Sequence, residues 1–248
     1  MNPVTVWQLI KFAMHGKINL GRCPVCDKST FFIEEGEYLR EHYRCYSCRS
    51  QPRNRALIQV LATHYPEYRS FRIHESSPCG PASEKIARDC PGYIPTQFFP
   101  DTLSGESRNG VRCENLECMT FPDNYFDLVI TQDVVEHVMH PDRAFADIAR
   151  TLKPGGAHLF TVPIFSRKKT LVRALDVDGV IQFIEEPDYH GNPVDDKGSL
   201  VFREWGEDIV DFIQESSGLA TSVYMMRDRN LGIDGQFLEV LVSRKPKN

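Results

Sequence analysis

The apolar positions from residue 68 onward alternate between a strand-like and a helix-like spacing. Residues 126–131 form a short apolar run typical of a strand buried on both faces. Apolar residues then recur with helical spacing over 145–152, the turn Lys-Pro-Gly-Gly ends that pattern, and a second strand-like run covers 157–162. This alternation predicts an α/β fold in which helices connect the strands of a mostly parallel sheet.

Weaker patterns extend this sheet in both directions. The further elements predicted are strands over 70–75, 93–98, 221–228 and 236–243, and helices over 81–89 and around 205–213. The residues between the last two strands are rich in turn formers, which favours an antiparallel pair at one edge of the sheet.

Four of the eight cysteines fall in two close pairs near the N-terminus. Cys23 and Cys26 form one C-x2-C pair, Cys45 and Cys48 form the other, and 18 residues separate the pairs. Two thiolate turns joined by a short hairpin are typical of a tetrahedral zinc site, and four cysteine ligands leave no open position for catalysis. We therefore expect structural Zn²⁺; reduced structural cysteines and a redox dithiol are the alternatives. The other four cysteines show no such pairing.

The charge is unevenly distributed along the chain. The net charge is −5, but residues 1–55 hold nine Lys/Arg against five Asp/Glu. The N-terminal segment is therefore basic and the remainder acidic, which disfavours a broad nucleic-acid surface while leaving RNA as an alternative partner. Arg49, Arg53 and Arg55 precede a helical pattern; a solvated helix start is the simpler interpretation, and binding of a phosphate or an acidic partner is the alternative.

Composition adds the class of protein. The hydrophobic content of 41% is ordinary for a globular chain, and no apolar run approaches the roughly 20 residues of a membrane span. The first residues also lack a signal-peptide pattern. A soluble cytoplasmic protein without a membrane partner is the expectation.

Three stretches together resemble a known family. The sequences LECMTFPDNYFDLVI (116–130), DVVEH (133–137) and ARTLKPGG (149–156) are similar to the middle of class I S-adenosylmethionine-dependent methyltransferases of the small bacterial type. The resemblance implies a Rossmann-like, seven-stranded, mostly parallel sheet that binds S-adenosylmethionine across the carboxyl ends of its strands, in agreement with the general rule for open α/β sheets. The expected organisation is an N-terminal helix (1–18), the zinc ribbon (19–50), a linker helix (51–67) and a methyltransferase domain (68–248) with an insertion at about 164–201.

The resemblance also implies which residues contact the cofactor. The turn after the first strand is glycine-rich in the family, whereas here it contains Gly80 as its one glycine; the small residues before it still allow close approach. Asp101 is the nearest acid to the second strand for the ribose hydroxyls, and the pair 115–116 aligns with the adenine contacts. The predicted cofactor set is Glu75, Ser76, Ser77, Gly80, Asp101, Asn115, Leu116, Thr131, Gln132 and Asp133.

The insertion contains the polar run YHGNP (189–193), which we expect to face the methyl acceptor. His190 is the candidate general base, because the ordinary pKa of histidine lies near neutrality. A structural, hydrogen-bonding role in the turn is the alternative for His190, and His137 is interpreted as a packing residue.

Three functions remain open from the sequence. The leading hypothesis is methyl transfer to a small-molecule or sugar-containing (glycan-type) acceptor, with the ribbon as a structural or docking element. The first alternative is an RNA methyltransferase that binds RNA through the ribbon. The second is a noncatalytic binding protein whose glycine-poor turn has lost cofactor affinity, because fold alone does not prove function.

Overall fold

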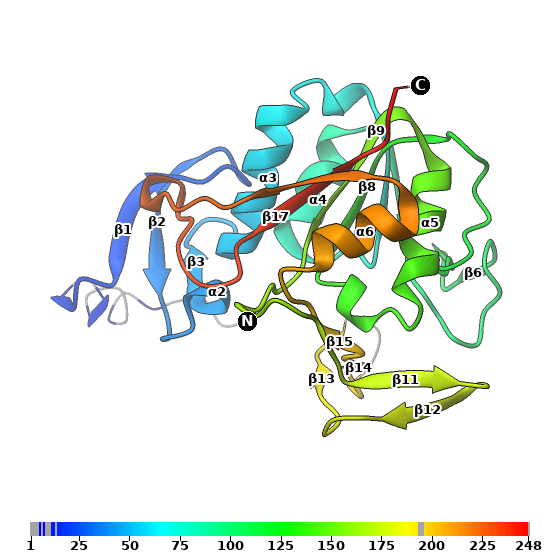
Figure 1. The fold of residues 1–248 in the computed structure, drawn as a ribbon. Helices are drawn as coiled ribbons and strands as arrows, with labels where there is room; N and C mark the ends of the chain where they lie inside the picture. The colour runs from blue at the N-terminus through cyan, green and yellow to red at the C-terminus, as the bar shows by residue number, and fades with distance from the viewer. Residues whose placement is uncertain (1–4, 6, 8–10, 13, 193–195, 248) are drawn as a thin grey trace.

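The computed structural model describes the chain except for residues 1–4, 6, 8–10, 13, 193–195 and 248 (Figure 1). Half of residues 1–18, over which a helix was expected, lie outside the described residues, and Ile18 begins a strand. At the centre lies a six-stranded sheet, ordered β16-β17-β9-β8-β4-β5. Its strands are β4 (Arg72–Ser76), β5 (Gly92–Thr96), β8 (Phe126–Gln132), β9 (Leu152–Thr161), β16 (Ala220–Tyr224) and β17 (Val240–Arg244). Neighbours from β5 to β9 are parallel, whereas β17 and β16 are antiparallel to the strands they pair with.

Helices cover both faces of this sheet. They are α3 (Pro52–His64), α4 (Gly80–Asp89), α5 (Pro141–Thr151) and α6 (Ile209–Ser217). Leu128 and Ile130 of β8 pack in one apolar cluster with α3 and α4, while Val129, between them in sequence, packs in a second cluster with α5 and α6. Alternate residues of a strand point to opposite faces, so the short apolar run of β8 serves both layers of helices.

The predicted seven-stranded sheet has six strands among the described residues. A seventh would lie beyond β5, where the structure has the two-residue strands β6 (Ser107–Arg108) and β7 (Val111–Arg112). A single parallel bridge between Gln97 and Cys113 is the contact made at that position. Residues 97–106 contain no helix to return the chain for a full parallel strand, and the left-handed turn at Gly110 directs it into the short β6–β7 pair.

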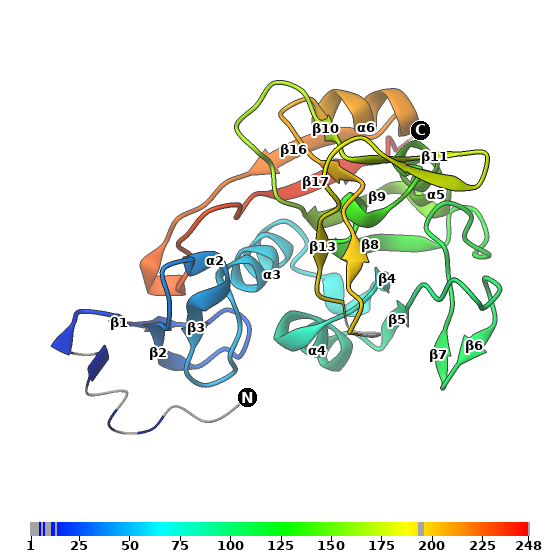
Figure 2. The same ribbon diagram turned by 90° about the horizontal axis from the view of Figure 1, so that it is seen from below.

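The N-terminal module shares the core of the large domain. It consists of β1 (Ile18–Arg22), β2 (Ser29–Glu34), β3 (Tyr43–Cys45) and the short helix α2 (Leu39–His42), with β2 between two antiparallel partners. Phe32 and Tyr43 are fully buried in the same apolar cluster as α3 and the sheet. Figures 1 and 2 show this module against α3 and the carboxyl-terminal hairpin. The hairpin carries the 3₁₀ turn η3 (Arg229–Leu231), which contacts β1.

The segment between β9 and α6 forms three small antiparallel pairs. They are β10 (Leu171–Val172) with β15 (Arg203–Glu204), β11 (Ala174–Val177) with β12 (Val180–Phe183), and β13 (Tyr189–His190) with β14 (Ser199–Leu200). The β11–β12 hairpin projects from the body of the molecule (Figure 1). Two further 3₁₀ turns are η1 (Tyr68–Ser70) and η2 (Val135–His137). In the part of the chain that is described, no helix has the length and apolar character needed to cross a bilayer.

Candidate functional site

The four predicted metal ligands come together at one end of the ribbon. The Sγ atoms of Cys23, Cys26, Cys45 and Cys48 all lie within 4.8 Å of one another. The Cys23–Cys48 and Cys26–Cys45 Sγ distances are 3.7 and 4.0 Å. A tetrahedral zinc with Zn–S bonds of about 2.3 Å requires sulfur atoms roughly 3.8 Å apart. The cluster therefore has the dimensions of a four-cysteine zinc site.

A second group of predicted residues meets at the carboxyl ends of β4 and β8. Glu75 is fully buried, and its carboxylate accepts hydrogen bonds from Ser83 Oγ at 2.7 Å, Gln132 Nε2 at 2.7 Å and Tyr93 OH at 2.6 Å. Burial raises the pKa of Glu75, and the three donors partly oppose that shift. The two predicted residues Glu75 and Gln132 are thus joined in one network.

The glycine-poor turn after β4 contains a serine, Ser77, in the left-handed backbone conformation. Ser77 has a φ of 55° and Gly80 a φ of 75°. Serine therefore takes the conformation that glycine adopts most readily, at a site where a non-glycine residue is strained. Adjoining it, Ser76 is buried at the end of β4, and Ser83 Oγ accepts from the Cys79 backbone N–H at 3.0 Å. The turn is consequently tied to Glu75 through Ser83.

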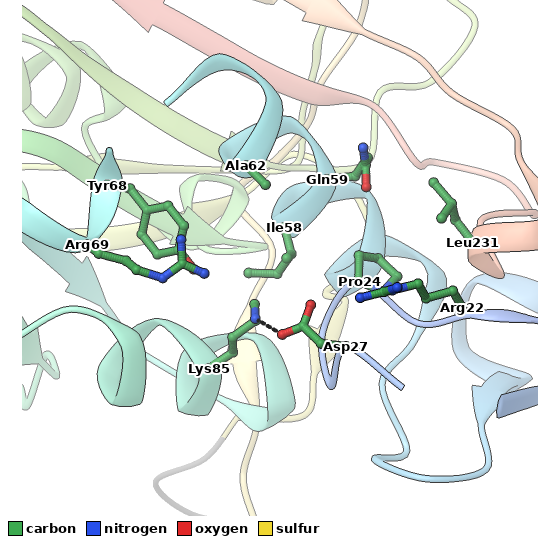
Figure 3. A pocket seen from close by; sticks show the side chains of 10 residues that line it. All are labelled: Arg22, Pro24, Asp27, Ile58, Gln59, Ala62, Tyr68, Arg69, Lys85 and Leu231. Atoms are coloured by element: carbon green, nitrogen blue, oxygen red, sulfur yellow. Dashed lines mark hydrogen bonds and ion pairs between the residues drawn. The ribbon is translucent and has the colours of Figure 1, made fainter. Parts of the chain in front are cut away.

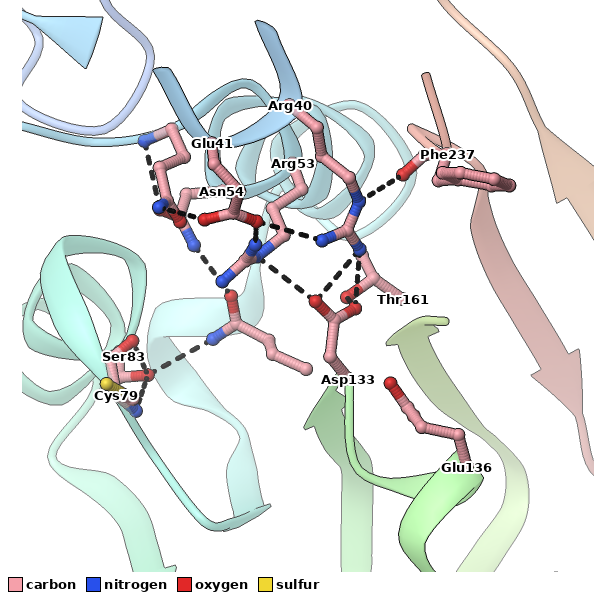
Figure 4. A network of polar contacts seen from close by, with 12 residues as sticks. Arg40, Glu41, Arg53, Asn54, Cys79, Ser83, Asp133, Glu136, Thr161 and Phe237 are labelled. Atoms are coloured by element: carbon pink, nitrogen blue, oxygen red, sulfur yellow. Dashed lines mark hydrogen bonds and ion pairs between the residues drawn. The ribbon is translucent and has the colours of Figure 1, made fainter. Parts of the chain in front are cut away.

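Asp133, directly after β8, is held by two arginines from the N-terminal half (Figure 4). Arg40 Nη2 lies 2.8 Å from both carboxylate oxygens, and Arg53 Nε lies 3.2 Å from Oδ2. Thr161 Oγ1 donates a third contact at 2.9 Å. Burial by itself would raise the pKa of Asp133, but the two guanidinium groups hold it below its ordinary value.

Two of the arginines at the start of α3 are not exposed to solvent, contrary to the interpretation of a solvated helix start. Arg55 is fully buried, donating to the backbone carbonyls of Ser50, Tyr43 and Gly232, and Arg53 pairs with both Asp133 and Glu41. Each guanidinium carries five donors in a fixed fork, which suits it to bridging separate segments. That interpretation is wrong for these two residues, because they bind the module to the sheet.

Other predicted cofactor residues already have local partners. Asp101 is exposed and pairs with Arg108 at 2.7 Å, while Asn115 Oδ1 accepts from the backbone N–H of Glu117 at 3.0 Å. Leu116 is buried in the α5–α6 cluster. Thr131 is fully buried and bonds His158 Nε2 at 2.9 Å. Glu75 and Gln132 therefore share one network, which Asn54 of α3 joins, and Asp133 lies in a neighbouring network through Arg53 of the same helix; these four residues lie outside both.

His190 lies next to His137, which is interpreted from the sequence as a packing residue. The rings of His190 and His137 meet edge to face with centroids 5.1 Å apart, and Glu136 completes a group whose ligand atoms lie within 4.8 Å of one another. Asp188 Oδ2 lies 3.8 Å from His190 Nε2. His137 is thus part of a polar cluster at the insertion as well as being partly packed.

Sequence reasoning missed several members of these networks. They are Arg40, Asn54, Ser83, Tyr93 and Glu136. Glu136 and Ser83 carried a weak signal, because they follow predicted strands at the carboxyl edge of the sheet. Nothing in the pattern connects Arg40 to Asp133, 93 positions later.

One cavity of the structure lies apart from the proposed cofactor edge. It is lined by Arg22, Pro24, Asp27, Ile58, Gln59, Ala62, Tyr68, Arg69, Lys85 and Leu231. It has a volume of about 190 Å³ and sits between the ribbon, α3 and α4 (Figure 3). Lys85 Nζ reaches across to Asp27 at 2.5 Å. None of the predicted cofactor residues lines it, so we treat it as a gap where the two modules meet.

Part of the chain is similar in sequence to known methyltransferases. Residues 99–160, about a quarter of the chain, match the family described as Methyltransferase domain. A ubiquinone/menaquinone biosynthesis C-methyltransferase UbiE of Francisella tularensis subsp. tularensis is 45% identical over 53 residues, which are 20% of this chain. This match spans about a fifth of that relative's length, 21%.

Solved structures extend the likeness to most of the fold. An S-adenosylmethionine-dependent methyltransferase from Mesorhizobium loti has a TM-score of 0.51 at 16% identity, covering 77% of this chain and 98% of that one. CalS10, an amino pentose methyltransferase from Micromonospora echinaspora solved with S-adenosylmethionine bound, has a TM-score of 0.50 at 13% identity and covers 79% of this chain and 92% of its own. The chain therefore has the fold of class I methyltransferases, and the segment through β8 and α5 carries the sequence of a methyltransferase domain.

Proposed function

We propose that this protein is an S-adenosylmethionine-dependent methyltransferase for a small-molecule or sugar-containing acceptor. The observation that carries the proposal is the pair of adjoining polar networks at the carboxyl ends of β4 and β8, one around Glu75 and Gln132 and the other around Asp133. Ligands of open α/β sheets bind at that edge. The family match through residues 99–160 includes β8 itself.

The charges at this edge fit the amino-acid end of the cofactor, which carries one ammonium and one carboxylate. Asp133 and Glu75 offer acceptors for the ammonium, and Arg40 and Arg53 offer donors for the carboxylate. The turn over 76–80 consists of small residues with a left-handed Ser77, which allows the backbone to approach a ligand closely. The remaining predicted contacts, Asp101 and Asn115–Leu116, stay proposals for the ribose and adenine.

Bound S-adenosylmethionine supplies an electrophilic methyl group on a sulfonium. The protein's own task is then to position the acceptor and, for a hydroxyl or amine, to remove its proton. The insertion over 164–201 is our candidate for the acceptor cover, with His190 as the candidate base. Zinc in the ribbon is proposed as structural, holding the module that presents Arg40 to the sheet.

A small acceptor is favoured over RNA because basic residues of the N-terminal half are bonded within the protein. Arg55 is fully buried and donates to backbone carbonyls, and Arg44 and Arg49 pair with Glu35. Phosphate binding relies on basic groups that are free to exchange counterions. CalS10 acts on an amino pentose and UbiE in quinone biosynthesis, and both kinds of acceptor are compatible with this proposal.

Calorimetric titration of the zinc-loaded protein with S-adenosylmethionine and with S-adenosylhomocysteine tests the proposal. We expect micromolar binding, weakened at least tenfold in Asp133→Asn and unchanged in Asp123→Asn, which alters an exposed acid paired with Arg150. Circular dichroism verifies that both variants fold. Absence of heat at two temperatures would favour the noncatalytic alternative, and equal affinity in both variants would remove Asp133 from the site.

A further inference from the structure

The side chains of Glu136, His137 and His190 form a cluster just beyond the proposed cofactor edge. Glu136 and His137 belong to η2, which follows Asp133, and His190 comes from β13 in the insertion. The backbone N–H of Phe202 donates to the carbonyl of Glu136 at 2.9 Å, which attaches the insertion to η2. Residues more than 50 positions apart are therefore held together by both backbone and side-chain contacts.

Glu136 is a buried carboxylate at the start of this cluster. The residue is 3% exposed, and neither of its side-chain oxygens has a hydrogen bond to another residue among those described. Oε1 points toward His137, with Nε2 at 4.0 Å. An unpaired buried carboxylate is costly unless it is protonated or meets a cation. Burial and the nearby Asp133 raise the pKa of Glu136 to about 8.

His137 is oriented as metal-binding histidines usually are. Its Nδ1 lies 2.9 Å from the carbonyl oxygen of Leu200, which accepts hydrogen bonds and cannot donate. Nδ1 therefore carries the proton, and Nε2 presents its lone pair toward Glu136. Histidine ligands commonly donate their other ring N–H to a backbone carbonyl in this manner, which fixes both tautomer and ring orientation.

The third member can move to complete the group. His190 has a side chain that is 44% exposed and is paired in register with Ser199 on β14. A tetrahedral metal with bonds of about 2.1 Å would bring its ligand atoms to roughly 3.4 Å from one another. The Glu136 Oε1–His137 Nε2 distance of 4.0 Å exceeds this by about 0.6 Å, and all ligand atoms of the group lie within 4.8 Å of one another. Rotation of the exposed imidazole would supply part of that closure.

We propose that Glu136, His137 and His190 bind a divalent transition metal ion such as Zn²⁺, Mn²⁺ or Fe²⁺. Two imidazoles and one carboxylate suit borderline metals and leave coordination positions open. The proposed role rests on the methyltransferase assignment above: the open positions would receive hydroxyl oxygens of the acceptor. A bound hydroxyl would release its proton to water more readily, since the metal stabilises the resulting anion. With the metal bound, His190 is therefore a ligand and does not serve as the base proposed above. The acceptor class is then a chelating diol, as in a sugar or a catechol.

Cobalt(II) binding to the full-length protein tests the site. The protein is first washed with chelator and its zinc content measured, so that metal in the closed cysteine site is known. Cobalt is then titrated by calorimetry and visible spectroscopy. Nitrogen and oxygen ligands give weak bands, whereas cobalt in the ribbon would give intense thiolate charge-transfer bands.

We expect one equivalent of cobalt with weak bands in the wild type. His190→Gln changes an exposed residue and should weaken binding at least tenfold, as should the isosteric Glu136→Gln. His140→Gln is the matched control, because His140 pairs with Asp176 outside the cluster. Equal cobalt affinity in all three variants, or no binding to the wild type, would overturn the site and leave Glu136 as a protonated acid.

Two further readouts separate this inference from the proposed function. Addition of catechol should shift the cobalt bands; unchanged bands would overturn the acceptor role. Titration of the same preparation with S-adenosylmethionine tests the methyltransferase proposal independently. Cobalt binding without cofactor binding would contradict the methyltransferase proposal and support the metal site. Cofactor binding without cobalt binding would contradict the metal site alone.

Discussion

Nη2 of Arg40 lies 2.8 Å from both carboxylate oxygens of Asp133, joining the ribbon module to the end of the central strand β8. Arg40 is 4% exposed, and its Nε also donates to the carbonyl of Phe237 at 3.0 Å. One side chain of the N-terminal module thus contacts the proposed cofactor edge and the carboxyl-terminal hairpin. The module is consequently part of the site's construction, which gives its four-cysteine cluster an indirect influence on that edge.

Replacing Arg40 with methionine should destabilise the protein by roughly 3 kcal/mol, as for a buried ion pair that loses one partner. Arg53 remains beside Asp133 and should limit the loss. Urea unfolding measures the difference. Arg69→Met is the matched control, because Arg69 is 59% exposed and lies 3.6 Å from Asp89; we expect less than about 1 kcal/mol. Equal losses would show that the Arg40 contact contributes no more than a surface pair.

Cys45→Ser should remove zinc and lower the melting temperature. The ribbon shares its apolar cluster with α3, so loss of the metal should loosen a surface that the large domain needs covered. A loss of about 2 kcal/mol corresponds to roughly 4–8 °C for a chain of this size. Elemental analysis and thermal unfolding measure the two effects. Cys118→Ser alters an exposed cysteine and should retain one zinc per chain; full zinc retention in Cys45→Ser would refute the four-cysteine site.

Ser77 provides a test of the glycine-poor turn. Its φ of 55° is accessible to glycine without strain but strongly disfavours β-branched residues. Ser77→Gly should therefore leave stability nearly unchanged, whereas Ser77→Val should cost about 1–2 kcal/mol and weaken S-adenosylmethionine binding. The control Ser222→Val lies in the extended backbone of β16, where valine is favoured. If all three variants behaved alike, the left-handed turn would have no bearing on stability or on the ligand.

His158 predicts a pH dependence of stability. Burial, together with the nearby His74, lowers the pKa of His158 from 6.5 to about 3. Between these values the unfolded chain binds a proton that the folded protein does not, so this group's stabilising contribution is lost as pH falls below 6.5. The slope approaches about 1.4 kcal/mol per pH unit.

His158→Gln should accordingly unfold less steeply with acid than the wild type between about pH 5.5 and pH 4, measured by urea titration at each pH. Glu75 and Glu136 have raised pKa values and act in the opposite direction, but they are present in both proteins and cancel in the difference. Parallel pH profiles for the two proteins would mean that His158 titrates normally in the fold.

The central part of the fold was predictable because its signals are local. The strand expected over 126–131 is β8, the helical spacing over 145–152 is α5 and the run over 157–162 lies in β9. Each combines a clear apolar period with a turn or helix signal. The seventh strand, which came from the family resemblance, is not confirmed among the described residues, because residues 97–113 have neither a crossover helix nor a long apolar run.

The site was predictable only in part, because its contacts are tertiary. Residues at strand ends, such as Glu75 and Gln132, meet as expected since parallel strands end at one edge of a sheet. The docking of Arg40 and the burial of Arg55 could not be predicted, because arginines at a helix start are usually solvated and nothing local indicates a partner. Likewise His137 comes to lie beside His190 because its ring bonds the carbonyl of Leu200 in β14, which pairs with β13.

The contacts of Arg55 affect the order in which the chain can fold during its synthesis. It links the carbonyls of Tyr43 and Ser50 to that of Gly232, so the N-terminal module and the carboxyl-terminal hairpin share one buried cation. The strand β17, Val240–Arg244, lies inside the sheet between β9 and β16. During synthesis at roughly 5–20 residues per second, the first fifty residues therefore wait about ten seconds or more for their partners. Until then Phe32 and Tyr43 lack the part of their covering that Ile233, Leu238 and Val240 provide, and transiently exposed apolar surface of this kind favours aggregation.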